Sequence, residues 1–180
     1  MVKPNKYQLE ELVELREFVI EVMASMEIWS EELLTKLTTI DLGVLRKNAT
    51  QRHGVTRWRQ GVRNPTIPEE VKVIELHPKL LSSEWKPYAA WVLHHEFVHA
   101  LGYTSHDSTF RSLERLWPSK DASTMGVKFT ELLRKQRAKW LWDVTSATKN
   151  ILGKKRVWAS TCVNPARWFY EMYPLRRHSD

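Results

Sequence analysis

Cysteine is almost absent from this chain of 180 residues, in which Cys162 is the only one. A single thiol excludes an intrachain disulfide and a four-cysteine metal site, and it suits a reducing compartment such as the cytoplasm. Long apolar runs are also absent, so we expect no membrane span, and residues 1–6 lack the apolar region of a signal peptide. With no internal repeat, a chain of this length is expected to form one monomeric domain around a single core.

Acidic residues are scarce in the C-terminal third, where residues 128–180 carry twelve basic residues and only four acidic ones. The formal charge of +7 for the whole chain comes from this segment. Bases alternate there with aromatic side chains, as in proteins that bind single strands or junctions of DNA through phosphate contacts and base stacking. The candidate nucleic-acid-binding residues are Lys154, Lys155, Arg156, Trp168, Arg176 and Arg177. The alternative is a solvated charged surface whose rings close the core.

The residues with the clearest chemistry are His95, Glu96 and His99, which form an H-E-x-x-H pattern. They lie in an apolar stretch, 85–101, that is predicted to be helical. Residues i and i+4 of a helix share one face, so both imidazoles can reach one metal ion. Glu96 can then act as the general base towards a water molecule. Gly102 is expected to end the helix in a left-handed conformation.

A third histidine, His106, follows seven residues after His99 and is the expected third ligand. Three protein ligands and one water form the open geometry of a catalytic site, so we expect one Zn²⁺ per chain. Asp107 is expected either to hold an imidazole or to cap the next helix, and the sequence does not separate these roles. His94 is expected to be partly buried or at the surface. The competing interpretation is a buried helix whose histidines only satisfy hydrogen bonds in the core.

The stretch around this pattern resembles the SprT-like metalloprotease family, which includes the Spartan DNA–protein crosslink proteases. The resemblance rests on residues 74–81, on the H-E-x-x-H pattern, and on His106 followed four residues later by Phe110. It covers roughly 42–117, within an expected protease domain of residues 1–126. It implies zinc-dependent cleavage of protein substrates, often coupled to DNA binding. Many members also carry a four-cysteine zinc ribbon, which this chain lacks.

The rest of the chain is predicted to be scaffold. The predicted elements are helices at 9–26, 31–37, 85–101, 108–117 and 127–148, and strands near Leu45, at 55–58 and at 71–76. Ser30 is expected to cap the second helix, and Ser82 or Ser83 the third. A strand beside the metal helix is able to hold an extended peptide by strand addition. Residues 127–180 are expected to form a basic, Trp-rich helix and tail packed on the same domain.

Together these patterns predict an α+β, compact zincin-type domain, in which a small antiparallel sheet packs on helices around a central metal helix. The expected function is that of a zinc metallopeptidase, with a DNA-associated role of the crosslink-processing type. Tyr103 and Arg111 are the nearest candidates for stabilising the oxyanion, and Glu114 is the fallback for the third ligand. A metzincin-like arrangement needs its third histidine at position 105, which is serine. The alternative function is a non-catalytic nucleic-acid-binding protein with a structural or vestigial zinc site.

Overall fold

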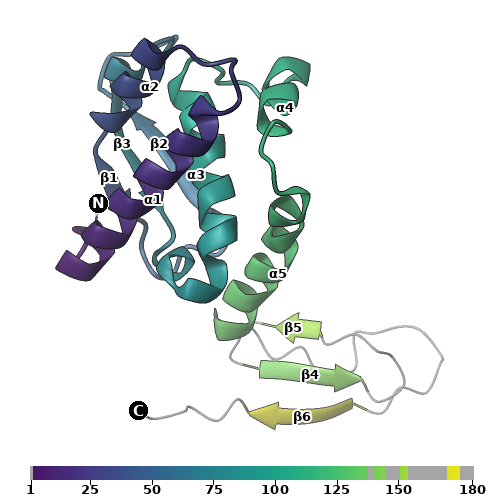
Figure 1. Ribbon diagram of the computed structural model, residues 1–180. Helices are drawn as coiled ribbons and strands as arrows, with labels where there is room; N and C mark the ends of the chain where they lie inside the picture. The colour runs from purple at the N-terminus through teal and green to yellow at the C-terminus, as the bar shows by residue number, and fades with distance from the viewer. Residues whose placement is uncertain (1, 138–139, 145–150, 154–169, 175–180) are drawn as a thin grey trace. The chain divides into compact units, whose positions relative to one another are not determined.

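The computed structural model describes the backbone of residues 2–137, 140–144, 151–153 and 170–174 (Figure 1). The chain divides into two compact units, residues 1–127 and residues 128–180. The first unit holds the three histidines of the candidate metal site. The candidate nucleic-acid-binding residues lie outside the described residues, and so does Cys162: they are Lys154, Lys155, Arg156, Trp168, Arg176 and Arg177. The expected packing of the basic segment on the first unit stays a prediction.

The first unit is built on a three-stranded sheet in the order β1-β3-β2, with β1 at Leu42–Val44, β2 at Gly54–Trp58 and β3 at Val71–Leu76. The chain reverses direction between β1 and β2 and again between β2 and β3. After these two reversals, β3 runs in the same direction as β1 and opposite to β2. It lies between them, so its pairing with β1 is parallel and its pairing with β2 is antiparallel. The α+β class is confirmed, but the sheet is mixed and the prediction of an antiparallel sheet is wrong.

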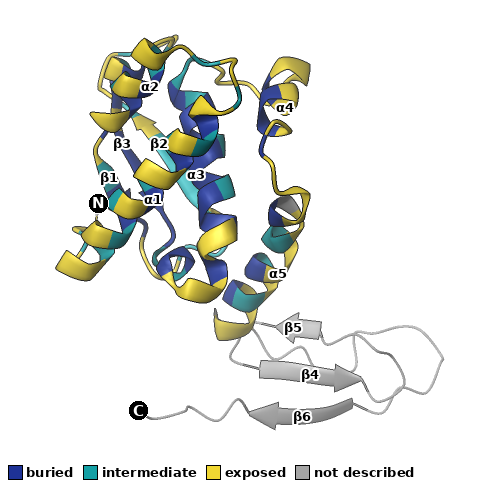
Figure 2. Cartoon of the chain, viewed as in Figure 1, coloured by how far each residue is buried: buried dark blue, intermediate teal, exposed yellow. Residues whose placement is uncertain are grey.

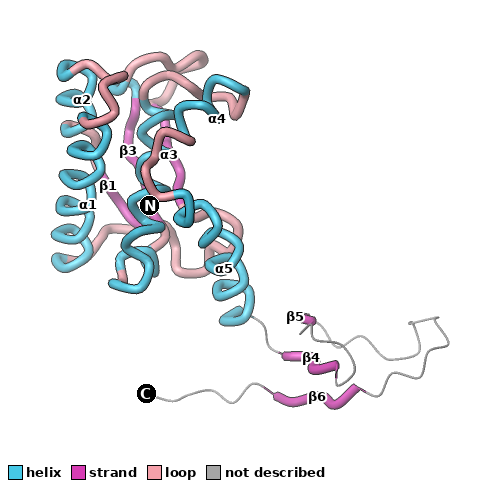
Figure 3. The backbone as a smooth tube through the Cα atoms, turned by 45° about the vertical axis from the view of Figure 1, so that its right-hand side comes forward, coloured by secondary structure: helices cyan, strands magenta, loops and turns pink. Residues whose placement is uncertain are grey.

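Two helices lie side by side on one face of this sheet, as Figures 1 and 3 show. Helix α1, Lys6–Ala24, packs on β1 and on α3, and α3, Lys86–Ala100, packs on β2 and β3. The buried residues of α1 recur every three or four positions, as the apolar pattern predicts: Leu12, Leu15, Val19 and Met23. The helix begins at Lys6 because the side chain of Asn5 accepts a hydrogen bond from the Gln8 N–H at 2.8 Å.

Helix α3 is buried along most of its length, as the dark blue in Figure 2 shows. Its start differs from the prediction: the α-helix begins at Lys86, after a 3₁₀ turn at Ser83–Trp85. The side chains of Ser82 and Ser83 therefore do not cap it, and the predicted cap is wrong. Its end is as predicted, because Gly102 has a φ of +99° and its N–H donates to the carbonyl of His99 at 2.9 Å.

Two short helices, α2 and α4, also lie in the first unit. Helix α2, Glu31–Thr38, is capped by Ser30, whose hydroxyl accepts from the Leu33 N–H, as predicted. Helix α4, Ser108–Glu114, packs on α3 and follows directly after the candidate third ligand. Within the described part of the chain, no helix has both the length and the apolarity that a membrane crossing requires.

The predicted long helix at 127–148 is wrong at both ends. Helix α5 spans Lys120–Arg137, and the chain then forms β4 at Trp140–Val144. Strand β4 pairs antiparallel with β5, Ile151–Gly153, and with β6, Tyr170–Pro174. The sequence Trp-Leu-Trp-Asp-Val is rich in aromatic and branched side chains, which favour a strand, and two neighbouring strands satisfy its backbone.

Candidate metal centre

Helix α3 and the segment after it bring three imidazole nitrogens together. His95 and His99 lie one turn apart on α3, and His106 lies just before α4. The Nε2 atom of His106 is 3.0 Å from Nε2 of His99 and 3.2 Å from Nε2 of His95. The three residues predicted as ligands from the sequence thus form one cluster, with their ligand atoms all within 4.8 Å of one another.

The opposite nitrogens of two of these rings are held by acceptors. Nδ1 of His95 donates to the Oε1 atom of Glu114 at 2.7 Å, and Nδ1 of His99 donates to the carbonyl of Tyr103 at 2.8 Å. An acceptor at Nδ1 places the ring proton there and leaves the Nε2 lone pair free. The Nε2 lone pairs of His95 and His99 are therefore available to a cation.

The donor set fits a zinc ion. Nitrogen ligands about 2.0–2.1 Å from a tetrahedral zinc ion lie about 3.3–3.4 Å from one another, close to the separations seen here. Protonation of His99 and His106 is disfavoured in the folded protein. Burial, followed by electrostatic repulsion from His95, lowers the pKa of His106, and burial lowers the pKa of His99 to about 4. Imidazole nitrogens that converge in this way are a metal-binding arrangement.

Glu114 is the acid that orients the cluster. Its side chain is buried, and its Oε2 atom accepts from Nη1 of Arg111 at 2.8 Å while Oε1 holds His95. Burial alone raises the pKa of Glu114, but the hydrogen bonds from His95 and Arg111 outweigh it and hold the pKa at about 2. Asp107 takes the other role left open by the sequence, because its carboxylate caps α4 by accepting from the Phe110 N–H at 2.9 Å.

Glu96 lies beside the cluster and is 5% exposed. Its Oε2 atom accepts a hydrogen bond of 2.7 Å from the Thr56 hydroxyl on β2. Burial raises the pKa of Glu96 above its usual range, and the hydrogen bond from Thr56 opposes that shift. Glu96 lines a cleft of about 370 Å³ together with the three histidines. The other lining residues are Arg52, Gly54, Val55, Thr56, Trp58 and Thr104.

Strand β2 forms one wall of the cleft with a free backbone edge. The His77 N–H donates to the carbonyl of His53 at 2.7 Å, which makes this pair a hydrogen-bonded pair of the β2–β3 ladder. Such pairs alternate along an antiparallel ladder, so the N–H and C=O groups of Gly54 and Thr56 point away from β3. No described strand pairs with β2 on that side. The cleft therefore presents backbone groups of β2 that pair with no described strand, and of these the Thr56 N–H donates to the Glu96 carboxylate.

His94 is not where the sequence suggested. Its side chain is 0% exposed and its ring lies 5.1 Å from the ring of Trp117, tilted by 34°. Neither ring nitrogen has a hydrogen-bond partner among the described residues. Burial, followed by the charge of His95, lowers the pKa of His94 to about 4. The expectation of a partly buried or surface residue is wrong, because α4 and the chain after it cover this side of α3.

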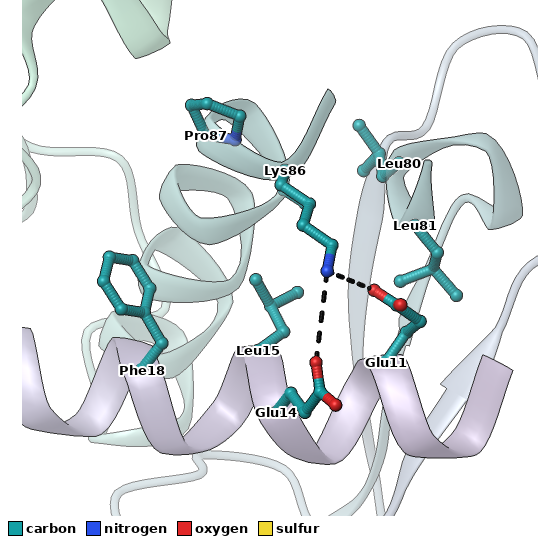
Figure 4. Close-up of a pocket in the computed structure, with 9 residues that line it drawn as sticks. Glu11, Glu14, Leu15, Phe18, Leu80, Leu81, Lys86 and Pro87 are labelled. Carbon is teal, nitrogen blue, oxygen red and sulfur yellow. Dashed lines mark ion pairs between the residues drawn. The ribbon is translucent and has the colours of Figure 1, made fainter. Parts of the chain in front are cut away.

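The two oxyanion candidates are engaged elsewhere in the described structure. Arg111 is paired with Glu114, and the Tyr103 ring packs edge-on against Trp29 at 6.4 Å. A second hollow, between α1 and the start of α3, is mostly apolar (Figure 4). Its lysine, Lys86, pairs with Glu11 at 2.8 Å and lies 4.0 Å from a carboxylate oxygen of Glu14, so the lysine charge is balanced within the hollow.

Sequence reasoning missed Glu114 as the partner of His95, and it missed both Gly54 and Thr56. The only sequence feature that indicates Glu114 is that it is an acid close to His106 in the chain. Asp107 shares this feature, so the sequence does not distinguish the two acids. Comparison with known proteins adds no relative: no protein family, no curated protein and no solved structure matches this chain.

Proposed function

We propose that the first unit is a zincin-type zinc metallopeptidase of the SprT-like kind, which hydrolyses amide bonds in protein substrates. One observation carries this proposal: three Nε2 atoms converge beside a buried carboxylate, at a cleft bordered by an open strand edge. Each of these parts has a role in amide hydrolysis. The histidines provide a cation site, the carboxylate provides a base, and the strand edge can hold an extended substrate backbone.

His95, His99 and His106 would hold the metal. Three imidazoles suit zinc, and they leave a coordination position for the reacting groups. A zinc ion bound there lowers the pKa of water and polarises the scissile carbonyl. Glu114 fixes the orientation of the His95 ring, and the Tyr103 carbonyl fixes that of His99.

Glu96 acts as the general base. It accepts a proton from the attacking water, whose oxygen forms a bond to the carbonyl carbon. The C–N bond then breaks, and Glu96 delivers the proton to the leaving amine nitrogen, so that a carboxylic acid and an amine result. Burial raises the pKa of Glu96, which brings it closer to neutral pH and makes its carboxylate a stronger base.

The substrate is proposed to be an extended, unfolded segment of protein. The N–H and C=O of Gly54 and the C=O of Thr56 point away from β3 and are able to pair with such a segment, while the Thr56 N–H donates to the Glu96 carboxylate. A folded substrate has its backbone groups already paired and cannot add to the strand. Cleavage should therefore favour unstructured proteins.

A DNA-associated role is part of the same proposal. It is supported by the excess of basic residues in 128–180 and by the resemblance to crosslink-processing proteases. Single-stranded or junction DNA is the proposed partner, because the basic residues alternate with aromatic ones. Such a role would place the protease on DNA inside the cell.

Glu96→Gln tests the proposal. Zinc-loaded protein is incubated with casein, with and without single-stranded DNA. Wild type should cleave casein, and Glu96→Gln should lose cleavage by several orders of magnitude while keeping its zinc, because the base is lost and the ligands remain. Glu84→Gln, the same change at an exposed acid, is the matched control. Equal behaviour of wild type and Glu96→Gln would favour the non-catalytic nucleic-acid-binding alternative.

A further inference from the structure

The carboxylate of Glu96 is held by β2 rather than by its own helix. Thr56 Oγ1 lies 2.7 Å from Glu96 Oε2 and 3.2 Å from the backbone carbonyl oxygen of Glu96. A hydroxyl has one proton, and the shorter contact to a charged acceptor takes it. The Thr56 hydroxyl therefore fixes the position of Oε2, and the Thr56 N–H adds a second hydrogen bond to the same carboxylate.

The second contact of β2 with Glu96 is made by Gly54. A Cβ at this position would lie 2.7 Å from Glu96 Oε1, 2.9 Å from Glu96 Cγ and 2.8 Å from Val92 Cγ1. The φ of Gly54 is not positive, so the backbone conformation does not require glycine there. Space requires it, because any larger residue would push the carboxylate or the strand aside.

The same two residues lie at the open edge of β2, where an extended peptide would pair with the Gly54 N–H and C=O and with the Thr56 C=O, while the Thr56 N–H donates to the Glu96 carboxylate. Substrate backbone and general base therefore meet at the same two positions. We propose that Thr56 and Gly54 are positioning residues that orient Glu96 and tie its position to the strand that receives the substrate. This inference rests on the proposed peptidase function.

A purely structural role for Thr56 predicts something different. Valine has nearly the same shape as threonine, with a methyl group in place of the hydroxyl, so it would fill the same space without donating a hydrogen bond. If Thr56 only fills space, Thr56→Val should leave turnover unchanged. If its hydroxyl orients the base, turnover should fall while peptide binding by the strand backbone persists.

The first measurement is the steady-state cleavage of an unstructured peptide by zinc-loaded protein. Thr56→Val should lower kcat by about ten- to a hundredfold, the cost typical of a displaced catalytic group, with KM changed by less than about twofold. Thr56→Ser, which restores the hydroxyl, should recover most of the lost kcat. Gly54→Ala should also lower kcat and retain zinc. Thr38→Val, at an exposed position of α2, is the matched control.

An unchanged kcat in Thr56→Val, or a Thr56→Ser variant as slow as Thr56→Val, would overturn the inference. A rise in KM at constant kcat would also overturn it, because it would make Thr56 a substrate-binding residue only. No cleavage by wild type would overturn the proposed function, and with it the role of Thr56 in positioning a catalytic base.

The second measurement needs neither metal nor activity. In chelator-treated protein, Thr56→Val should lower the urea midpoint of unfolding more in the wild-type background than in a Glu96→Ala background, because only the backbone carbonyl of residue 96 then remains as an acceptor for the Thr56 hydroxyl. An equal lowering in both backgrounds would show that the Thr56 hydroxyl does not act through the Glu96 carboxylate. This cycle separates a failure of the contact from a failure of the peptidase proposal.

Discussion

Glu114 should set the zinc affinity of the histidine cluster without binding the metal itself. Its two carboxylate oxygens accept from His95 Nδ1 and Arg111 Nη1, at 2.7 and 2.8 Å. Since its pKa is about 2, Glu114 is charged at neutral pH. Glu114→Gln keeps the shape and one oxygen acceptor but removes the charge. Glu114→Ala removes both, leaving His95 unoriented and Arg111 unpaired.

The expected cost follows from these contacts. Partners that orient metal-binding histidines typically account for a 10- to 100-fold change in affinity, which is about 1.4–2.7 kcal/mol. Glu114→Gln should fall near the lower end, because its amide oxygen can still accept from His95 Nδ1. Glu114→Ala should reach the upper end. The predicted order of zinc affinity is therefore wild type, then Glu114→Gln, then Glu114→Ala.

Competition with a chromophoric zinc chelator near neutral pH measures these affinities. Glu84→Gln, an exposed acid changed in the same way, should bind zinc like wild type. Equal affinities for wild type and Glu114→Ala would refute the reasoning, since the hydrogen bond to His95 would then contribute nothing. Complete loss of zinc in Glu114→Gln would make Glu114 a ligand instead.

Three further predictions concern stability and partners. His94→Phe should be neutral or stabilising near neutral pH, because it removes buried nitrogens without partners. The pKa of His94 is about 4 in the folded protein and 6.5 in the unfolded chain, so His94 lowers the free energy of unfolding by about 3 kcal/mol as pH falls from 6.5 to 4. Chemical denaturation should show that His94→Phe lacks this contribution. Gly102→Ala should cost more than Gly61→Ala in thermal denaturation: both have positive φ, but only at Gly102 would a Cβ meet the Thr66 carbonyl, at 2.8 Å. Changing residues 154–156 together to alanine should weaken binding to single-stranded oligonucleotides and flatten its salt dependence, and unchanged anisotropy titrations would contradict this.

Local features were predictable from the sequence. The i, i+4 spacing of His95 and His99 depends only on helix geometry, and the ends set by Ser30 and Gly102 depend on residues within one turn. The strand at 71–76 is bounded as predicted because its apolar run is short and flanked by prolines. In each case the determining contacts lie close together along the chain.

Contacts between distant parts of the chain were not predictable in this way. Thr56 meets Glu96 across forty positions and Glu114 meets His95 across nineteen, so no spacing rule links them. His94 was misplaced because α3 is apolar on nearly every side, and helical periodicity then gives no exposed face. The sequence of β4 predicts a helix because Trp140, Leu141 and Val144 also fit a helical spacing, and only the pairing with two later strands favours a strand.

The zinc content of the purified protein, measured by mass spectrometry after zinc loading and dialysis, tests the proposed metal centre most directly. Wild type should hold about one zinc per chain, because the described residues bring three histidines to one point. His95→Ala and His99→Ala should hold almost none, and His106→Ala should hold far less than wild type. Wild-type protein that remains free of zinc, or a His99→Ala variant that retains it in full, would contradict the account.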